Sequence, residues 1–124
     1  MSFFSVSLSP RVFTFACYPT TAPYQIIVDD MIDTGSRIIQ CASVLRASGA
    51  RRVFAFCTHG LFSGDAVQRI SASELTEVVV TNTTPVREYA NKIRHLSVSG
   101  LLAECIRRIF NNESVAEVYK MPRM

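Results

Sequence analysis

The segment from Ile26 to Arg37 constrains the fold of this 124-residue chain more than any other part of it. An apolar stretch ends in two adjacent carboxylates, Asp29 and Asp30, and a short Asp-Thr-Gly-Ser loop follows them. Apolar residues then recur at helical spacing, so the pattern predicts a buried strand, a tight turn and a helix. In an open parallel sheet, the loop after such a strand lies where ligands bind.

This strand–loop–helix pattern is chemically suited to a sugar phosphate. The carboxylates of Asp29 and Asp30 can accept hydrogen bonds from vicinal ribose hydroxyls. The small loop residues can offer backbone N–H groups to a phosphate at the positive end of the helix. Adjacent carboxylates are costly to bury unless they are paired or hydrogen-bonded. The alternative is therefore a purely structural role for both aspartates, as a helix cap or in a solvated turn.

Strands and helices are expected to alternate along the rest of the chain. Apolar runs predict strands at 25–30, 52–58, 77–81 and 93–98, and helical spacing predicts helices at 37–48 and 63–72, the latter capped by Ser63. A last helix is expected to begin at Ser99 and to turn these residues inward: Leu101, Leu102, Cys105, Ile106 and Ile109. Residues 113–120 are expected to form a short strand or a tail. The alternation indicates a parallel three-layer α/β sheet with right-handed crossovers.

Composition narrows the classes of function. The four cysteines form no Cys-x-x-Cys pair, which disfavours a zinc site. Cys41, Cys57 and Cys105 fall in apolar segments and are expected to be buried, reduced thiols of a cytoplasmic protein. A net charge of +3 with scattered basic residues disfavours a nucleic-acid or membrane partner. The hydrophobic content of 48% predicts apolar surface that meets another subunit, in a homo- or hetero-oligomer.

Residues 1–24 differ from the remainder and are assigned as a leader, with the domain proper at 25–120. They hold Ser, Phe, Thr and Pro, a single arginine and no acidic residue. An organelle transit peptide has a similar composition, but Pro10, Pro19 and Pro23 disfavour an amphipathic helix. The favoured interpretation is a divergent or artificial leader before a truncated domain. Within it, residues 12–17 are apolar and β-prone enough to add one strand.

Four segments carry a family resemblance. They are IIVDDMIDTGSR at 26–37, THGLFSG at 58–64, EVVVTNT at 77–83, and LAECIRR at 102–108 with NESV at 112–115. In this order and spacing they resemble the C-terminal part of the ribose-phosphate pyrophosphokinases, or phosphoribosyl pyrophosphate synthetases, and of their non-catalytic associated proteins. The resemblance covers about 25–119. It implies the C-terminal half of a type I phosphoribosyltransferase-like fold.

The resemblance implies a ribose 5-phosphate site in the first segment. In the family the acidic pair faces the ribose hydroxyls, directly or through a magnesium ion, and the loop after it holds the phosphate. The substrate-binding residues carried over in this way are Asp29, Asp30, Asp33, Thr34, Gly35, Ser36 and Arg37. Magnesium is the cofactor that the resemblance implies.

The loop departs from the family at Ser36 and Arg37, where most synthetases carry Gly and Thr. A glycine at position 36 would tolerate a positive φ, which serine does not readily adopt. Arg37 in the first helical turn opposes the helix dipole at a cost of about 0.3–1 kcal/mol. We expect it to pair with an anion, either the 5-phosphate or Asp33. The alternative is a solvated arginine without a role.

Two further positions resemble a regulatory site. Ser114 and Tyr119 match family positions that help to bind a regulatory phosphate or nucleotide. Ala116 stands where the family has a second serine, so this site is partial at best. His59 has no carboxylate or cysteine partner visible in the sequence, which favours a cap or a packed ring over catalysis.

The family's reaction moves the terminal diphosphoryl group of ATP onto the ribose 1-hydroxyl, a kinase-type transferase step in nucleotide biosynthesis. In the family the N-terminal half supplies the ATP contacts, and a basic loop precedes the matched region. Residues 1–28 contain Arg11 and no lysine. We therefore expect a C-terminal fragment that binds ribose 5-phosphate, needs another half or subunit for ATP, and is inactive alone. The alternatives are a non-catalytic synthetase-associated subunit and, less favoured, a free-standing phosphoribosyltransferase relative.

Overall fold

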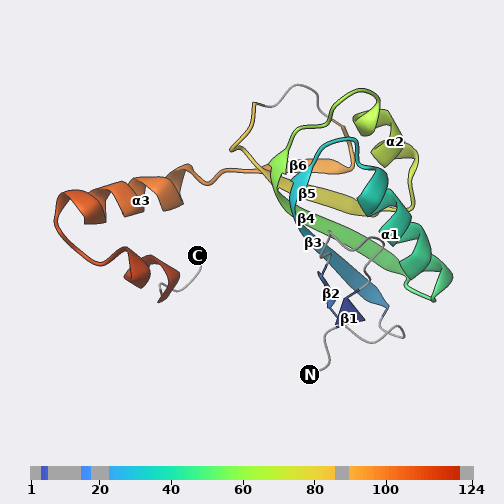
Figure 1. Cartoon of the computed structure of the whole chain (residues 1–124), viewed down its shortest axis with the longest axis horizontal. Helices are drawn as coiled ribbons and strands as arrows, with labels where there is room; N and C mark the ends of the chain where they lie inside the picture. The colour runs from blue at the N-terminus through green and yellow to red at the C-terminus, as the bar shows by residue number, and fades with distance from the viewer. Residues whose placement is uncertain (1–3, 6–14, 18–22, 86–89, 121–124) are drawn as a thin grey trace.

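The computed structural model describes residues 4–5, 15–17, 23–85 and 90–120 (Figure 1). Their elements, in chain order, are β1 (Phe4–Ser5), β2 (Phe15–Cys17), β3 (Tyr24–Ile32), α1 (Ser36–Ala47), β4 (Arg52–Gly60), α2 (Ala66–Ala72), β5 (Glu77–Thr81), β6 (Ile93–Leu96), α3 (Ser99–Phe110) and the 3-10 helix η1 (Val115–Lys120). None of these helices is long and apolar enough to cross a membrane.

The strands form one sheet in the order β1-β2-β3-β4-β5-β6. The strands β3 to β6 run parallel, β2 pairs antiparallel with β3, and β1 pairs antiparallel with β2. The β2 strand falls within the expected strand at 12–17, of which residues 12–14 lie outside the described residues. The predicted parallel α/β fold is confirmed.

The core lies between the sheet and two helices. One row of buried side chains crosses the parallel strands, because Ile27 pairs with Ala55, Ala55 with Val78, and Val78 with Ile93. The helices α1 and α2 cover this row with their own buried residues, which are Ile38, Cys41, Ala42, Leu45, Ala66, Val67 and Ile70. The burial of Cys41 and Cys57 agrees with the expectation for these two thiols.

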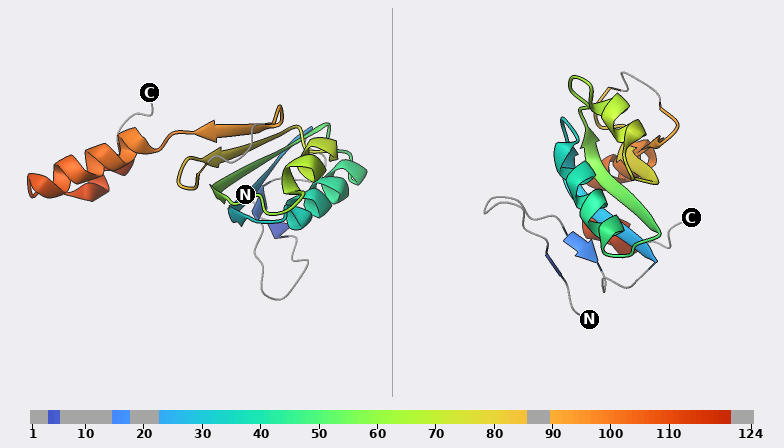
Figure 2. Two further views of the ribbon diagram at one scale, coloured as in Figure 1. Left: turned by 90° about the horizontal axis from the view of Figure 1, so that it is seen from above. Right: turned by 90° about the vertical axis from the view of Figure 1, so that its right-hand side faces the viewer.

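Both covering helices lie on the same side of the sheet (Figure 2). The parallel strands follow one another in chain order, and crossovers of the right-handed kind that parallel strands favour return successive helices on one side. The third layer expected from the alternation of elements is therefore absent from the described residues. The opposite face of the sheet carries exposed apolar side chains, among them Ile26, Val28 and Phe56.

The helix α3 begins at Ser99, as predicted, but projects away from the sheet (Figures 1 and 2). The prediction that its apolar residues face the core is wrong, because none of its residues is buried. Ile106 and Ile109 are 67% and 64% exposed. Cys105, expected to be buried, is only partly covered. An amphipathic pattern indicates that one face of a helix is apolar but not which surface covers it.

Two smaller expectations also change. Ser63 does not cap α2, which begins three residues later at Ala66 with Asp65 in the capping position. Within residues 113–120, expected to be a short strand or a tail, Val115–Lys120 form the 3-10 helix η1.

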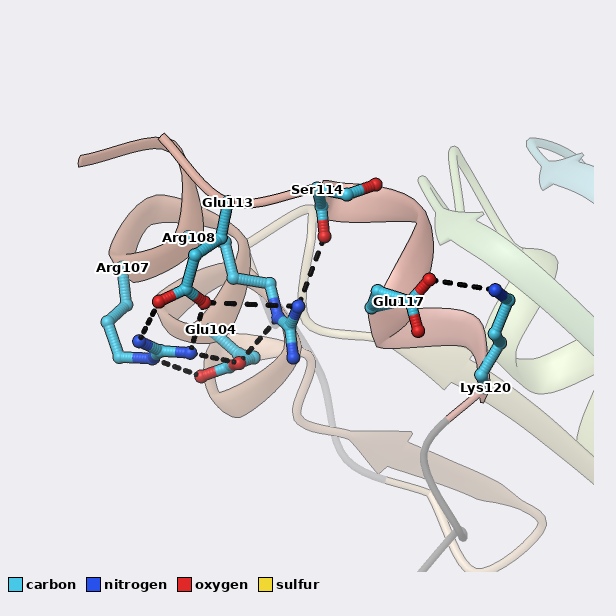
Figure 3. A network of polar contacts seen from close by, with 7 residues as sticks. All are labelled: Glu104, Arg107, Arg108, Glu113, Ser114, Glu117 and Lys120. Carbon is cyan, nitrogen blue, oxygen red and sulfur yellow. Dashed lines mark hydrogen bonds and ion pairs between the residues drawn. The ribbon is translucent and has the colours of Figure 1, made fainter. Parts of the chain in front are cut away.

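An ion-pair network holds the end of α3 to the turn before η1 (Figure 3). The carboxylate of Glu104 accepts hydrogen bonds from Arg107 at 2.9 Å and from Arg108 at 2.7 Å. Arg107 also donates to Glu113 at 3.0 Å, and Arg108 donates to the carbonyl oxygen of Ser114 at 3.1 Å. The hydrogen bonds from Arg107 and then Arg108 lower the pKa of Glu104 to about 2, so this carboxylate stays ionised at neutral pH.

Candidate functional site

A tight turn joins the carboxyl end of β3 to the first turn of α1. Gly35 sits at the helix N-terminus with a φ of 73°. A Cβ atom at this position would lie 3.3 Å from the Cδ1 atom of Ile70, which is fully buried. The positive φ therefore falls at Gly35, whereas Ser36 is already helical and needs no glycine.

A cavity of about 190 Å³ lies at this turn. It is lined by Asp29, Met31, Ile32, Asp33, Thr34, Gly35, Ser36, Arg37 and Ile38. Of the seven residues predicted to bind ribose 5-phosphate, all but Asp30 line this cavity. The first turn of α1 contains no acidic residue, and no side chain caps its N–H groups. These N–H groups lack helical acceptors and face the region where an anion is stabilised by the helix dipole.

The two adjacent aspartates differ in their surroundings, as strand alternation predicts. The side chain of Asp29 is only 7% exposed, whereas Asp30 is exposed to solvent. The Asp29 carboxylate accepts the backbone N–H of Asp30 at 3.0 Å and lies 3.9 Å from a guanidinium nitrogen of Arg37. Burial raises the pKa of Asp29, and these two contacts offset the effect only in part.

Arg37 has an anionic partner in the protein. This partner is Asp29 and not Asp33, the protein anion expected from the sequence. The guanidinium of Arg37 lies beside the Asp29 carboxylate, with 43% of the side chain still exposed. Asp29 precedes the turn and Arg37 follows it, so the ion pair spans the loop. The sequence alone did not indicate this cross-loop pair. Contact between Arg37 and a phosphate stays a prediction.

Arg69 on α2 is a loop contact that the sequence did not reveal. It donates to the Ser36 hydroxyl at 3.1 Å and to the Thr34 carbonyl at 3.4 Å, and it lies 3.9 Å from Asp65. Thirty-three residues separate Arg69 from Ser36. Only the packing of α2 beside α1 brings them together, and no local motif signals it. A second guanidinium, from α2, therefore contacts the loop.

The adjoining strand ends carry a hydroxyl cluster around His59. Its Nδ1 atom lies 2.8 Å from the Thr83 hydroxyl, which donates to the Thr58 carbonyl at 3.0 Å. The Thr81 hydroxyl lies 2.9 Å from that of Thr83. His59 is thus held by a threonine from the next strand connection, and the structural role favoured from the sequence stays a prediction.

The suggested regulatory residues lie apart from this loop. Ser114 and Tyr119 are both exposed and belong to the arm made of α3 and η1 (Figure 1). Their role stays a prediction.

The donor set for magnesium is small. The described residues contain no group of three or more His, Cys, Asp or Glu side chains able to hold a metal ion. Asp30 offers one accessible carboxylate, and Mg²⁺ is commonly held by one or two carboxylates together with substrate phosphates and water. The residues present therefore fit a metal ion that arrives with a phosphorylated substrate, rather than one held by the protein alone.

Comparison with known proteins identifies the family. Residues 20–120 match the phosphoribosyl synthetase-associated domain. The chain belongs to this family. The match confirms the resemblance drawn from the four sequence segments.

The related proteins are ribose-phosphate pyrophosphokinases. The chain is 48% identical over 97 residues to that of Pasteurella multocida and 50% identical to that of Haemophilus ducreyi. Each alignment covers 76% of this chain and 31% of the relative. The phosphoribosylpyrophosphate synthetase from Mycobacterium smegmatis matches with a TM-score of 0.73 and 37% identity, over 84% of this chain and 35% of that one. The chain therefore spans about a third of the length of these relatives.

We predict that Asp29→Asn changes stability in a pH-dependent way. Burial places the pKa of Asp29 in the folded chain above its unfolded value of 3.8, so protonation favours folding. The stabilisation from the protonated form is present below pH 3.8 and is lost as the pH rises through the folded pKa. The melting temperature of Asp29→Asn relative to wild type should therefore rise between pH 3.5 and pH 7, as measured by circular dichroism. The exposed Asp30→Asn is the matched control, and a relative melting temperature that falls with pH would contradict the assignment.

Proposed function

We propose that this chain is the ribose 5-phosphate-binding, C-terminal part of a ribose-phosphate diphosphokinase, the enzyme class that converts ATP and ribose 5-phosphate to phosphoribosyl pyrophosphate and AMP. The observation that carries the proposal is the cavity between β3 and α1, which combines uncapped helical N–H groups with the carboxylate of Asp29, next to the exposed Asp30 in the chain. A phosphate and a diol are the two functional groups of ribose 5-phosphate that such a site would recognise.

In this proposal the loop binds the phosphate. The N–H groups at the start of α1 and the hydroxyls of Thr34 and Ser36, which lie 3.2 Å apart, donate hydrogen bonds to it. Arg37, from α1, and Arg69, from α2, supply positive charge at the loop. An arginine can bind an oxyanion through two N–H groups. In this proposal Arg37 and Arg69 each keep one present contact and turn other N–H groups to the phosphate.

The acidic pair binds the sugar in this proposal. Asp30, which is exposed, accepts hydrogen bonds from the ribose hydroxyls or shares a magnesium ion with the substrate. Asp29, whose side chain is only 7% exposed, orients Arg37 through their ion pair and fixes the backbone of Asp30 by accepting its N–H. The ATP site then belongs to another part of the protein or to a partner subunit.

The ion pair between Asp29 and Arg37 favours a second candidate, a non-catalytic synthetase-associated subunit. It engages one of the two carboxylates with a cation that most synthetases lack at this position. Such a subunit would regulate a catalytic partner rather than turn over substrate. The retained Thr34-Gly35 sequence weighs against this candidate, because the loops of the associated proteins lose it.

Titration of the labelled chain with ribose 5-phosphate, followed by backbone amide NMR, tests the proposed site. The largest shifts are expected at residues 34–38, because their N–H groups would contact the phosphate. Ribose alone should shift residues near Asp30, and inorganic phosphate should shift only the loop. Arg37→Ala is expected to weaken binding about tenfold, equivalent to one lost charge-assisted contact.

Arg46→Ala is the matched control, since Arg46 lies at the far end of α1. An affinity unchanged by Arg37→Ala would remove the phosphate role of Arg37. Largest shifts elsewhere in the chain would remove the site itself. A third outcome would favour the regulatory subunit. The chain would then bind ribose 5-phosphate and change the activity of a catalytic partner, but would add no synthesis of its own.

A further inference from the structure

Successive backbone carbonyl groups of the turn between β3 and α1 face one segment of the chain. This segment, residues 61–70, is termed here the supporting segment and consists of the loop before α2 and the first turn of that helix. The Ile32 carbonyl accepts the backbone N–H of Leu61 at 2.8 Å, and the Asp33 carbonyl accepts that of Ser63 at 3.1 Å. Backbone N–H groups of the supporting segment thus hold two carbonyl groups of the turn.

A side chain of the supporting segment holds the third carbonyl. Arg69 donates to the Thr34 carbonyl through Nη1 at 3.4 Å and to the Ser36 hydroxyl through Nη2 at 3.1 Å. One planar guanidinium therefore bridges two residues of the turn. We propose that Arg69 is a positioning residue, which directs the backbone N–H of Gly35 at the substrate phosphate by holding the Thr34 carbonyl on the opposite side. The identity of the anion in this inference rests on the proposed function.

The direction of the N–H groups follows from the planar peptide unit. In a trans peptide, the C=O and the following N–H point in opposite directions. Carbonyl groups that face the supporting segment therefore turn the N–H groups of Asp33, Thr34 and Gly35 away from it. The cavity lies on that other side, because the described residues that line it come from β3, the turn and α1 and include none of residues 61–70. Successive N–H groups of this kind form a concavity that binds anions.

The peptide between Thr34 and Gly35 depends on Arg69 more than its neighbours do. Gly35 has a φ of 73°, and glycine populates positive and negative φ about equally. The two preceding carbonyl groups are held by backbone N–H groups, which do not depend on the side chains present. Without Arg69 this peptide is free to rotate and to turn its carbonyl oxygen toward the phosphate. Two oxygens would then repel each other where an N–H donor is needed.

The packing of α2 places the Arg69 guanidinium within reach of the turn. The next residue, Ile70, is fully buried, and its Cδ1 atom lies 3.3 Å from the position that a Cβ atom on Gly35 would occupy. The side chain of Arg69 is 40% exposed, so its charge stays solvated while its N–H groups contact the turn. The carboxylate of Asp65, one helical turn earlier, lies 3.9 Å from Nη1. These contacts restrict the guanidinium to the position that bridges the turn.

Two replacements separate positioning by Arg69 from an effect of its positive charge alone. Citrulline has the shape of arginine but no charge. It keeps an NH₂ donor for the Thr34 carbonyl and places an oxygen that accepts the Ser36 hydroxyl. Methionine is unbranched and apolar, with neither a donor nor a charge. Native chemical ligation at Cys57 and Cys105 gives the full chain with citrulline at position 69.

Titration with ribose 5-phosphate, followed by backbone amide NMR, gives the affinity of each chain. Arg69→Met is expected to raise the Kd about tenfold, and citrulline at position 69 is expected to raise it by less than about threefold. Arg46→Met is the matched control, since Arg46 also donates to a backbone carbonyl, that of Ala50 at 2.8 Å, but at the far end of α1. The affinity for ribose, which has no phosphate, should be the same in all variants. Equal losses for citrulline and methionine would assign the effect to charge and overturn the proposal.

Residual dipolar couplings of the ligand-free chains test the orientation directly. The N–H vector of Gly35 is expected to turn from its wild-type direction in Arg69→Met, and to keep this direction with citrulline at position 69 and in Arg46→Met. A vector that Arg69→Met leaves unchanged would overturn the proposal, whatever the affinities. The proposed function is tested separately, by binding of ribose 5-phosphate to the wild-type chain. If that binding is absent, the couplings still decide whether Arg69 orients Gly35.

Discussion

The purified chain, supplied with ATP, ribose 5-phosphate and magnesium, is expected to form phosphoribosyl pyrophosphate no faster than a protein-free control. Diphosphoryl transfer depends on positioning ATP and on neutralising the charge that develops on the phosphates. The described residues offer no cluster of metal ligands, and Arg37 and Arg69 are both engaged at the loop. Positioning of reactants can supply roughly 7–11 kcal/mol of the barrier reduction, so its loss alone would make the reaction undetectable. AMP release in a coupled assay measures the reaction.

The control for this assay is the double variant Asp29→Asn, Asp30→Asn. A contaminating enzyme from the expression host would give the same signal in the wild-type and variant preparations. Turnover that the double variant abolishes would instead show that the chain holds a complete active site. The conclusion that ATP is bound elsewhere would then be wrong.

The strand–loop–helix unit was predictable because local physical chemistry specifies it. The apolar run of β3 needs burial, and the Gly35 backbone adopts a φ that other residues resist. The helical spacing after it places Ile38, Ala42 and Leu45 on the buried side of α1. These signals all lie within a window of some 20 residues, so no knowledge of the remaining fold is required.

The contacts that complete the candidate site could not be predicted in the same way. Arg69 reaches Ser36 through the packing of α2, and His59 reaches Thr83 through the alignment of neighbouring strands. Both contacts depend on tertiary arrangement rather than on sequence spacing. The ion pair of Arg37 with Asp29 was not among the alternatives drawn from the sequence for a related reason, because Asp29 is more distant in sequence than Asp33 but lies across the loop.

The orientation of α3 illustrates a different limit. Its bounds at Ser99 and near Asn111 followed from capping and spacing, and they agree with the structure. Its amphipathic pattern correctly indicated an apolar stripe, but a stripe carries no information on whether its cover comes from the same chain. The connection to α3 is held in part by Asn82, which lies 16 residues before Val98 and accepts its N–H.

Substitution of Gly35 by alanine should reduce both stability and ribose 5-phosphate affinity more than the same change at Gly64. Both glycines have a positive φ, 73° and 64°, so alanine costs roughly 1–2 kcal/mol of stability at either position. At Gly35 the new Cβ would also press on the buried Ile70 at 3.3 Å, whereas at Gly64 it meets no atom within 4 Å. Relief of this contact displaces the start of α1, and with it the N–H groups of the loop. We expect a further loss of stability in urea titrations and at least a tenfold weaker Kd by calorimetry for Gly35→Ala alone. Equal Kd values for the two variants would show that the phosphate is not held by this turn.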